Sequence, residues 1–512
     1  MKKRLVLTVA GFAFVLVFAA ISALSQTGQK GRKKVLKPNV ILIMADDLGY
    51  GETGCFGQKI ISTPNIDRLA REGMRFTDFY AASPVCAPSR CGMLTGRNMG
   101  HAYIRDNVEV GEWDSFMGQM PLKDSTFTLG TLMQQAGYKT ACIGKWGLGG
   151  PGSSGIPTRQ GFHYFYGYLC QRQAHNYYPS YLWRNEEKIN IENPVFSPHQ
   201  KFKGNAANVA SYKKFQGNVY SQDLITEEAS RFIREHRDSV FFLYLAFNLP
   251  HLALQVPGIY LDIYKWTLID KPYSGYSGYL PCAYPHATYA AMIAALDDYV
   301  GKVVASVKDA GLDSNTLILF TSDNGATFQV GGADPSYFQS NGILKANKGS
   351  LYEGGIRVPM IARWPGMIKA GKVSGLPCAS WDFMSTLADL TGYSLSPDQD
   401  GISILLELLG VKGQKKHDYL YWEYPGRGGA MAVRMGDWKG VWKNVTSEPY
   451  RRVELYNLKT DTGELHNIAK DHPEKVKQIM EYMGKRTTAE VPEWNFIGKK
   501  FIKNLAPDTK GH

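Results

Sequence analysis

Three runs of consecutive apolar residues predict buried strands, and polar residues follow each run. The runs are residues 39–44 (NVILIM), 239–247 (SVFFLYLAF) and 316–320 (TLILF), and the polar residues after them are Asp46 and Asp47, Asn248 to His251, and Ser322 to Gly325. Unbroken apolar runs are typical of strands that a parallel sheet buries on both faces. Open α/β sheets bind their ligands at the carboxyl ends of the strands. We therefore expect these polar residues to lie at a ligand-binding edge.

Helical patterns lie between the predicted strands. The five helical segments are residues 64–72, 128–137, 222–235, 287–311 and 381–390. Strands that alternate with helices indicate a mostly parallel sheet that helices cover on both faces. Residues 184–217 are polar and rich in lysine, and we interpret them as a surface excursion and a candidate binding loop.

The pattern changes after about residue 410, where short apolar segments alternate with polar residues. The strand-like segments are residues 419–423, 430–435, 438–442 and 453–456, and a helical pattern follows at residues 473–482. This order predicts a small antiparallel sheet with one helix. The predicted fold class is therefore α/β, with a large mixed, mostly parallel sheet sandwiched by helices in residues 38–410 and a small C-terminal α+β subdomain in residues 411–512.

The N-terminus has the pattern of an export signal. Three basic residues (Lys2, Lys3 and Arg4) precede an apolar run, and small residues end the segment at about Ser25. This arrangement predicts a cleaved signal peptide at residues 1–25, with an uncleaved anchor as the alternative. No later stretch approaches the length of a transmembrane helix, so we expect a periplasmic or secreted protein without an integral membrane segment after cleavage.

Composition narrows the class further. Among the 512 residues, 44% are hydrophobic and 20% are charged, which excludes disordered, collagenous and coiled-coil proteins. Lys and Arg number 58 against 46 for Asp and Glu, so an anionic partner is expected, although no motif points to a nucleic acid. The seven cysteines have no metal-binding spacing, and an odd number leaves one that is free or chemically special beside zero to three disulfides.

One cysteine heads the most informative string, residues 86–97 (CAPSRCGMLTGR). The segment after Arg90 is predicted to start a helix whose N-terminus favours an anion near Cys86, and a bare cysteine there could act as a thiolate nucleophile. The string resembles the signature of the formylglycine-dependent (type I) sulfatases of the alkaline-phosphatase-like superfamily. The resemblance implies a sulfuric ester hydrolase in which a formylglycine-generating maturation enzyme converts Cys86 to formylglycine (3-oxoalanine).

Two acidic motifs are similar to the metal motifs of the same family. Asp46 and Asp47 belong to the first, and Asp323 and Asn324 belong to the second. The resemblance implies that these four residues, together with residue 86, surround one metal ion. Oxygen ligands without thiolate or imidazole suit Ca²⁺, with Mg²⁺ as the alternative.

The cationic motifs of the family also have counterparts. The segments around Lys145 and Lys348 resemble its sulfate-binding lysine motifs, and Arg90 lies one helical turn after Cys86. His251 follows the strand end where the family places the histidine that protonates the leaving group. The resemblance therefore implies catalytic roles for Arg90, Lys145, His251 and Lys348.

One position departs from the family pattern. Gly147 stands where the family commonly has the histidine assigned to the formylglycine hydroxyl. The base for the second step is therefore open, with His101, His175, an aspartate ligand or water as alternatives.

Polar loops offer candidates for substrate contact. The candidates are His101, Arg105, Gln173, His175 and Glu423. We hypothesise that His175 reads a sugar hydroxyl next to the sulfate, with a galactose-type ring preferred over a glucose-type ring.

The sequence as a whole predicts an exported enzyme that removes sulfate from a carbohydrate, such as a sulfated galactose or N-acetylgalactosamine unit. A phosphate or phosphonate ester hydrolase of the same superfamily is the nearest alternative. An inactive glycan-binding homologue is the alternative from another class.

Overall fold

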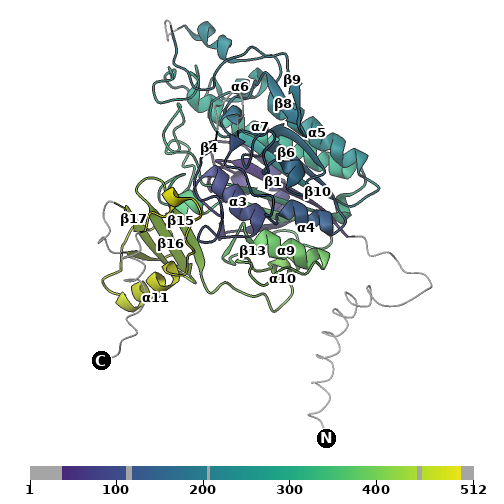
Figure 1. Ribbon diagram of the computed structural model, residues 1–512. Coiled ribbons are helices and arrows are strands. Elements are labelled where there is room, and N and C mark those ends of the chain that lie inside the picture. The colour runs from purple at the N-terminus through teal and green to yellow at the C-terminus, as the bar shows by residue number, and fades with distance from the viewer. Residues whose placement is uncertain (1–36, 111–117, 204–207, 447–452, 498–512) are drawn as a thin grey trace, which may run out of the picture. The chain divides into compact units, whose positions relative to one another are not determined.

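A large sheet organises the chain in this computed structural model, which describes residues 37–110, 118–203, 208–446 and 453–497 (Figure 1). The strand order is β13 (Lys372–Ser374), β2 (Met74–Phe76), β12 (Met360–Arg363), β11 (Thr316–Ser322), β1 (Asn39–Asp46), β10 (Phe241–Pro250), β6 (Lys139–Lys145), β7 (Tyr164–Tyr168), β8 (Tyr181–Arg184) and β9 (Glu187–Asn190). The central strands from β11 to β7 are parallel, and both flanks contain antiparallel pairs. This arrangement confirms the predicted mixed, mostly parallel sheet.

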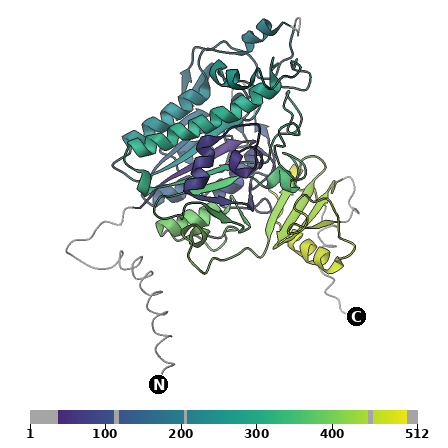
Figure 2. The same ribbon diagram turned by 180° about the vertical axis from the view of Figure 1, so that it is seen from behind.

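Helices cover both faces of this sheet (Figures 1 and 2). One face packs against α2 (Pro64–Glu72), α5 (Ser221–Glu235), α6 (Gly258–Tyr264) and α7 (Pro285–Asp309), and the other packs against α3 (Cys86–Thr95), α4 (Leu129–Gln135) and α9 (Asp382–Thr391). The apolar run of β1 is continuous because the strand is buried on both faces: Leu42 packs into the core on one side of the sheet, and Ile43 packs into the core on the other side. All five predicted helices are confirmed, with bounds that differ by at most two residues.

The C-terminal part forms a second, smaller sheet with its own core. Its antiparallel strands are β15 (Leu420–Tyr424), β16 (Ala430–Met435), β17 (Trp438–Lys443) and β18 (Glu454–Asn457), and α11 (Pro473–Met483) packs on it. Met431, Val433 and Ile479 are among the buried residues between this sheet and α11. The predicted sheet-and-helix pattern is therefore confirmed (Figure 1).

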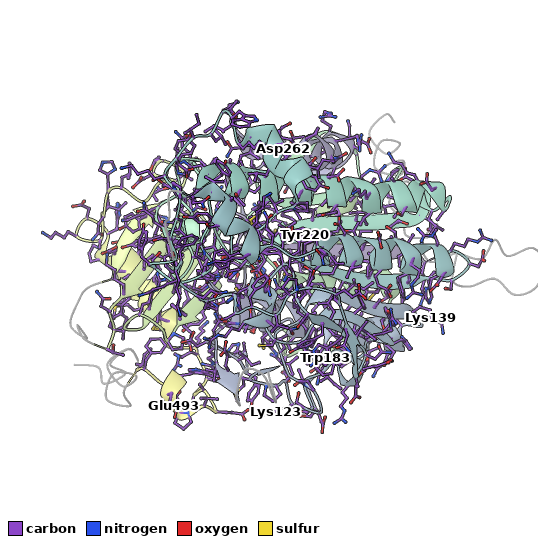
Figure 3. All side chains as sticks on the ribbon, turned by 90° about the horizontal axis from the view of Figure 1, so that it is seen from above. Lys123, Lys139, Trp183, Tyr220, Asp262 and Glu493 are labelled. Carbon is purple, nitrogen blue, oxygen red and sulfur yellow. The ribbon has the colours of Figure 1, made fainter. Side chains whose placement is uncertain are left out.

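Short elements complete the described chain. They are the strand pairs β3 (Phe79–Tyr80) with β14 (Cys378–Ala379) and β4 (Glu109–Val110) with β5 (Gly118–Gln119), the helices α8 (Glu353–Ile356) and α10 (Leu405–Leu409), and the 3₁₀ helices η1 (Gly54–Phe56), η2 (Pro157–Arg159), η3 (Gln173–His175), η4 (Val209–Phe215), η5 (Asp313–Asn315) and η6 (Pro492–Trp494). The predicted excursion at residues 184–217 contains edge strand β9 and η4. Figure 3 shows the side chains from above, with Tyr220 at the start of α5.

Two predictions concern the chain outside this core. The predicted signal peptide at residues 1–25 lies outside the described residues. Among the residues that are described, no helix combines the length and the apolar character that a membrane crossing requires.

All seven cysteines are free thiols. The structure therefore contains none of the zero to three disulfides that the sequence allowed.

Candidate active site

Four neighbouring parallel strands end at one edge of the large sheet and deliver polar side chains there. Strand β11 is followed by Asp323 and Asn324, β1 by Asp46 and Asp47, and β10 by His251, while β6 ends in Lys145. The backbone N–H of Asp47 donates to Asp323 Oδ1 at 3.1 Å, which joins the ends of β1 and β11. Parallel pairing thus brings together residues that lie more than 270 positions apart in the sequence.

Helix α3 brings Cys86 to the same edge. The helix begins at Cys86 itself, so the prediction of a start after Arg90 was wrong by five residues. Residue 86 therefore lies at the positive end of the helix dipole, where an anion is favoured. Cys86 Sγ lies 3.5 Å from Asp46 Oδ1 and 3.3 Å from Lys348 Nζ.

The group around Cys86 fits a cation. Ligand atoms of Asp46, Asp47, Cys86 and His251 all lie within 4.8 Å of one another. Asn324 donates its Nδ2 to Asp47 Oδ1 at 2.8 Å, which leaves its Oδ1 buried and without a hydrogen-bond partner. A buried carbonyl oxygen without a donor is costly unless a cation or another donor satisfies it. The oxygen-rich donor set suits a hard divalent ion.

Three cations neutralise the carboxylates. Lys145 Nζ donates to Asp46, and Lys348 Nζ lies 2.7 Å from Asp47 Oδ1. Arg90 Nη2 and Nε donate to Asp323 Oδ2 at 2.9 and 3.0 Å, and its side chain is fully buried. Arg90 therefore holds a carboxylate in place beneath the pocket.

The carboxylates respond differently to this environment. Burial alone would raise the pKa of Asp46, but Lys145, His251 and the other nearby cations lower it below its ordinary value. Burial and the charges of Asp46 and Asp47 raise the pKa of Asp323 to about 7, although Arg90 opposes the shift. Because the three carboxylates lie close together and repel one another, additional positive charge would stabilise their ionised forms.

The two candidate reactive side chains are both uncharged in this environment. Burial raises the pKa of the Cys86 thiol well above its ordinary value, although Lys145 and Lys348 oppose the shift. Burial and Lys348 lower the pKa of His251 to about 4. Because His251 Nδ1 lies 2.6 Å from the carbonyl oxygen of Leu252, which can only accept, Nδ1 carries the proton of the neutral ring and Nε2 is bare.

A polar pocket of about 470 Å³ opens above these groups. Its lining residues are Val85, Cys86, Asn107, Glu109, Gln171, Arg172, His175, His251, Tyr279, Thr327, Phe328, Lys348, Tyr424 and Arg427. Of the predicted site residues, Cys86, His175, His251 and Lys348 line the pocket. Six predicted residues are buried and are not among the lining residues: Asp46, Asp47, Arg90, Lys145, Asp323 and Asn324. Asp46 contacts Cys86 and Asp47 contacts Lys348, so both carboxylates lie directly behind the pocket lining.

Four predicted substrate contacts are not brought to this pocket. Arg105 Nη1 lies 2.7 Å from Glu423 Oε1, and both side chains are buried in this ion pair. His101 Nδ1 lies 2.7 Å from Asp400 Oδ1, and Gln173 Nε2 donates to the carbonyl of Tyr181 at 3.0 Å. These interactions engage the four side chains within the protein, and none of His101, Arg105, Gln173 and Glu423 is among the residues that line the pocket.

His175 reaches the pocket and also touches His251. The two rings stack with centroids 4.5 Å apart and an angle of 13° between their planes. His175 Nδ1 lies 2.9 Å from His199 Nε2. Burial, together with the neighbouring His251, lowers the pKa of His175 well below its ordinary value, so a neutral ring supports the proposed acid.

Further residues line the pocket beside the predicted ones. Arg427 stands over the Phe328 ring at 4.7 Å and donates to the Lys348 carbonyl at 3.4 Å. Tyr279 packs its ring against His199 at 4.9 Å. Tyr279 was missed by sequence reasoning because its loop has no motif, whereas Gln171 lies inside the polar loop that also contains His175.

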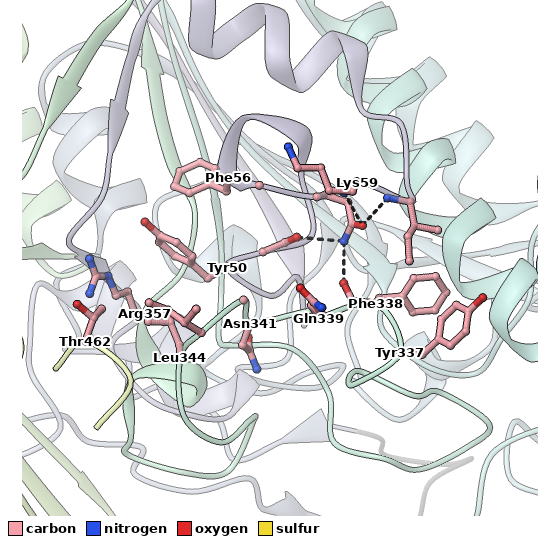
Figure 4. A pocket seen from close by; sticks show the side chains of 16 residues that line it. Tyr50, Phe56, Lys59, Tyr337, Phe338, Gln339, Asn341, Leu344, Arg357 and Thr462 are labelled. Carbon is pink, nitrogen blue, oxygen red and sulfur yellow. Dashed lines mark hydrogen bonds between the residues drawn. The ribbon is translucent and has the colours of Figure 1, made fainter. Parts of the chain in front are cut away.

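A second cavity of about 430 Å³ lies elsewhere, beside Tyr50 and Phe338 (Figure 4). Gln58 is one of its lining residues, and its side-chain amide donates to the carbonyls of Gly51 and Phe338 at 3.1 Å. The same amide accepts from the N–H groups of Lys59 and Ile60 at 2.9 Å. Its hydrogen-bonding capacity is used within the protein, in contrast to the unpartnered oxygen of Asn324.

Fold and site together place a cysteine, three carboxylates and three cations at one sheet edge, below a polar pocket. The family model "Sulfatase" matches residues 38–393, and the model "N-sulphoglucosamine sulphohydrolase, C-terminal" matches residues 346–491. The chain belongs to the sulfatase family, and it is a sulfuric ester hydrolase.

The chain is similar to individual sulfatases over most of its length. Arylsulfatase A of Bos taurus is 32% identical over 475 residues, which cover 84% of this chain and 83% of the relative. The N-acetylgalactosamine-6-O-sulfatase of Bacteroides thetaiotaomicron is 28% identical over 503 residues, which cover 87% of this chain and 92% of the relative. The crystal structure of Ps i-CgsB in complex with k-i-k-neocarrahexaose superposes with a TM-score of 0.72 at 27% identity, covering 92% of this chain and 100% of that one.

Proposed function

We propose that this chain is an exported, periplasmic or secreted, enzyme that removes sulfate from a sulfated carbohydrate. The observation that carries the proposal is the position of Cys86, at the start of α3 and within 3.5 Å of both a carboxylate and Lys348. Relatives named as an N-acetylgalactosamine-6-O-sulfatase and as a complex with a neocarrahexaose support a carbohydrate substrate. Residues 38–410 form the proposed catalytic domain, and residues 411–512 form the proposed subdomain.

The proposed resident groups are a Ca²⁺ ion, with Mg²⁺ as the alternative, and a converted residue 86. Asp46, Asp47, Asp323 and Asn324 would hold the ion, which would supply positive charge to the sulfate oxygens and acidify a hydroxyl of residue 86. After conversion of Cys86 to formylglycine by a maturation enzyme and its hydration, that hydroxyl supplies the nucleophile that attacks sulfur. The unpartnered Asn324 oxygen and the raised pKa of the Cys86 thiol support both assignments.

The cationic side chains stabilise the transferring group. Lys348 faces the pocket beside residue 86, and Lys145 lies beneath it on Asp46, so both place positive charge where negative charge develops on the sulfate. Arg90 fixes Asp323 through two donated hydrogen bonds. Lys348 is placed to contact the substrate, whereas Lys145 and Arg90 act from beneath the pocket, next to the carboxylates that they hold.

His251 is the proposed acid for the leaving alcohol. Its Nε2 must gain a proton before it can donate one, because the neutral ring carries its proton on Nδ1. A bound sulfate ester brings negative charge next to the ring and favours the imidazolium form. His175, stacked against His251, is placed to contact the sugar beside the sulfate, and a galactose-type ring is the proposed preference.

Matched substrates test this function. The matured enzyme would be assayed with monosulfated galactose, N-acetylgalactosamine, glucose and N-acetylglucosamine isomers and with the corresponding phosphate esters. We expect sulfate release from a galactose-type sugar at the highest kcat/KM. Faster hydrolysis of the phosphate esters would favour a phosphoester hydrolase, and binding without turnover would favour an inactive glycan-binding protein.

A further inference from the structure

Gly147 leaves no room for a side chain. Its φ is +82°, in the left-handed region, and a Cβ added there would lie 2.5 Å from Gln171 Cγ and 3.0 Å from Gln171 Cδ. Real Cβ atoms do not approach other heavy atoms so closely. The side chain of Gln171 therefore fills the space that a side chain at residue 147 would need.

The network around Gln171 fixes the orientation of its amide. Asn107 Oδ1 accepts a hydrogen bond from the backbone N–H of Ala87 at 3.0 Å, so this Asn107 atom is the carbonyl oxygen. The Gln171 atom that faces it at 3.4 Å must then be the donor, Nε2. Gln171 is thereby connected, through one side chain, to the residue that follows Cys86.

The other end of the amide is an acceptor without a donor. Gln171 is only 5% exposed, it lines the pocket with Cys86, and its Oε1 is buried without a hydrogen-bond partner. A buried acceptor gains free energy when a ligand group donates to it. The sulfate group of the ester is fully ionised at neutral pH and offers no donor, so the donor is a hydroxyl, either of the sugar or of residue 86 once it is converted and hydrated.

We propose that Gln171 is a positioning residue that takes the place left by Gly147, with its Oε1 accepting a hydrogen bond from a hydroxyl of the converted and hydrated residue 86. The inference rests on the proposed function of the pocket. An amide does not take up the proton at neutral pH, so Gln171 orients the hydroxyl and does not serve as the base. This hydrogen bond also favours the hydrated form of residue 86 over the free aldehyde, because the aldehyde has no hydroxyl to donate.

Gln171→Met tests the proposal, because methionine has a similar length and no strong acceptor. We expect kcat to fall about tenfold, equivalent to about 1.4 kcal/mol, with KM within about twofold of the wild-type value. Gln173→Met is the matched control: Gln173 is 6% exposed, lies two residues further along the same loop, and donates to Tyr181 outside the pocket lining. Wild-type kcat in Gln171→Met would show that space filling suffices and would overturn the proposal.

A second readout does not depend on turnover. The rate at which an aminooxy reagent traps the aldehyde of residue 86 would be followed by intact mass in the wild type, Gln171→Met and Gln173→Met. Loss of the hydrogen bond shifts residue 86 towards the free aldehyde, so we expect trapping in Gln171→Met to be faster by about threefold or more. An unchanged trapping rate would overturn the proposal. An unconverted cysteine in the wild-type protein would instead overturn the proposed function on which it rests.

Discussion

His175 is the predicted substrate contact that reaches the pocket, and its stacking on His251 gives it a second influence on the reaction. Its ring lies 4.5 Å from the His251 ring, and its Nδ1 is engaged with His199. Removal of the ring therefore affects the sugar subsite directly and the proposed acid indirectly.

We expect His175→Ala to lower kcat/KM on the preferred sugar sulfate by about tenfold or more, or about 1.4 kcal/mol. The loss on a small aryl sulfate should be smaller, because that substrate depends only on the support that His175 gives His251. Steady-state kinetics on both substrates give the comparison. Equal losses would assign His175 to the chemistry alone, and no loss on either would exclude it from the site.

Residues that belong to local motifs are the ones that could be placed at the sheet edge from the sequence. Cys86, the two metal motifs and the lysine segments are each defined by their sequence neighbours, and the structure brings them together. The buried ion pair of Arg105 with Glu423 was not foreseen, because its members lie 318 positions apart. A partner so distant in the sequence leaves no local signal.

At the scale of elements, the metal site depends on the ends of β1 and β11. Three carboxylates crowd there, and burial with the neighbouring charges raises the pKa of Asp323 to about 7. A divalent cation that binds the folded protein and not the unfolded chain stabilises it by mass action. The strand ends should therefore be more stable when the ion is bound.

We expect Ca²⁺ to raise the melting temperature of the chelator-treated protein. At a hundredfold excess of Ca²⁺ over its Kd, the free energy of unfolding should increase by about 2.7 kcal/mol. Differential scanning fluorimetry with Asn324→Leu as the paired variant gives the measurement. The variant should lose the Ca²⁺-dependent increment, because it lacks the oxygen that has no partner in the protein. A shift with Zn²⁺ but none with Ca²⁺ would contradict the oxygen-based ligand set.

Most elements could be predicted because their apolar residues are periodic or continuous. The start of α3 was missed because Val85, the residue before it, offers no side-chain cap. Pro88 was a usable signal, since proline is tolerated in the first turn of a helix and not in its interior. Strand β6 was not predicted, because its short run mixes Lys, Thr, Cys and Gly with the apolar residues.

At the scale of the whole described fold, a buried ion network joins α8 of the larger part to the small sheet. Lys439 in β17 has no solvent exposure and lies 2.8 Å from Glu353 Oε1 and 3.0 Å from Glu464 Oε1. Burial raises the pKa of Glu464 to about 7, with Glu353 adding to the shift and Lys439 opposing it. This network could not be predicted, because its members come from three separate segments of the chain.

The raised pKa of Glu464 makes stability depend on pH. Between about pH 4.5 and pH 7 the folded protein keeps the proton of Glu464 and the unfolded chain releases it, so this residue lowers the free energy of unfolding as the pH rises through that window. Glu464→Gln removes this contribution. We expect the stability of the variant relative to the wild type to increase from pH 4.5 to pH 7 in urea denaturation. A constant difference across that window would contradict the assignment.

Sulfate release by matched cysteine variants tests whether residue 86 supplies the nucleophile. Cys86→Ala and Cys91→Ala both shorten a buried cysteine of α3, but only Cys86 lines the pocket. Initial rates on the preferred sugar sulfate would be measured for the wild type and both variants, with the mass of residue 86 determined in the same preparations. We expect formylglycine at residue 86 in the wild type and Cys91→Ala, sulfate release by both, and none by Cys86→Ala. Sulfate release by a folded Cys86→Ala protein would contradict this expectation.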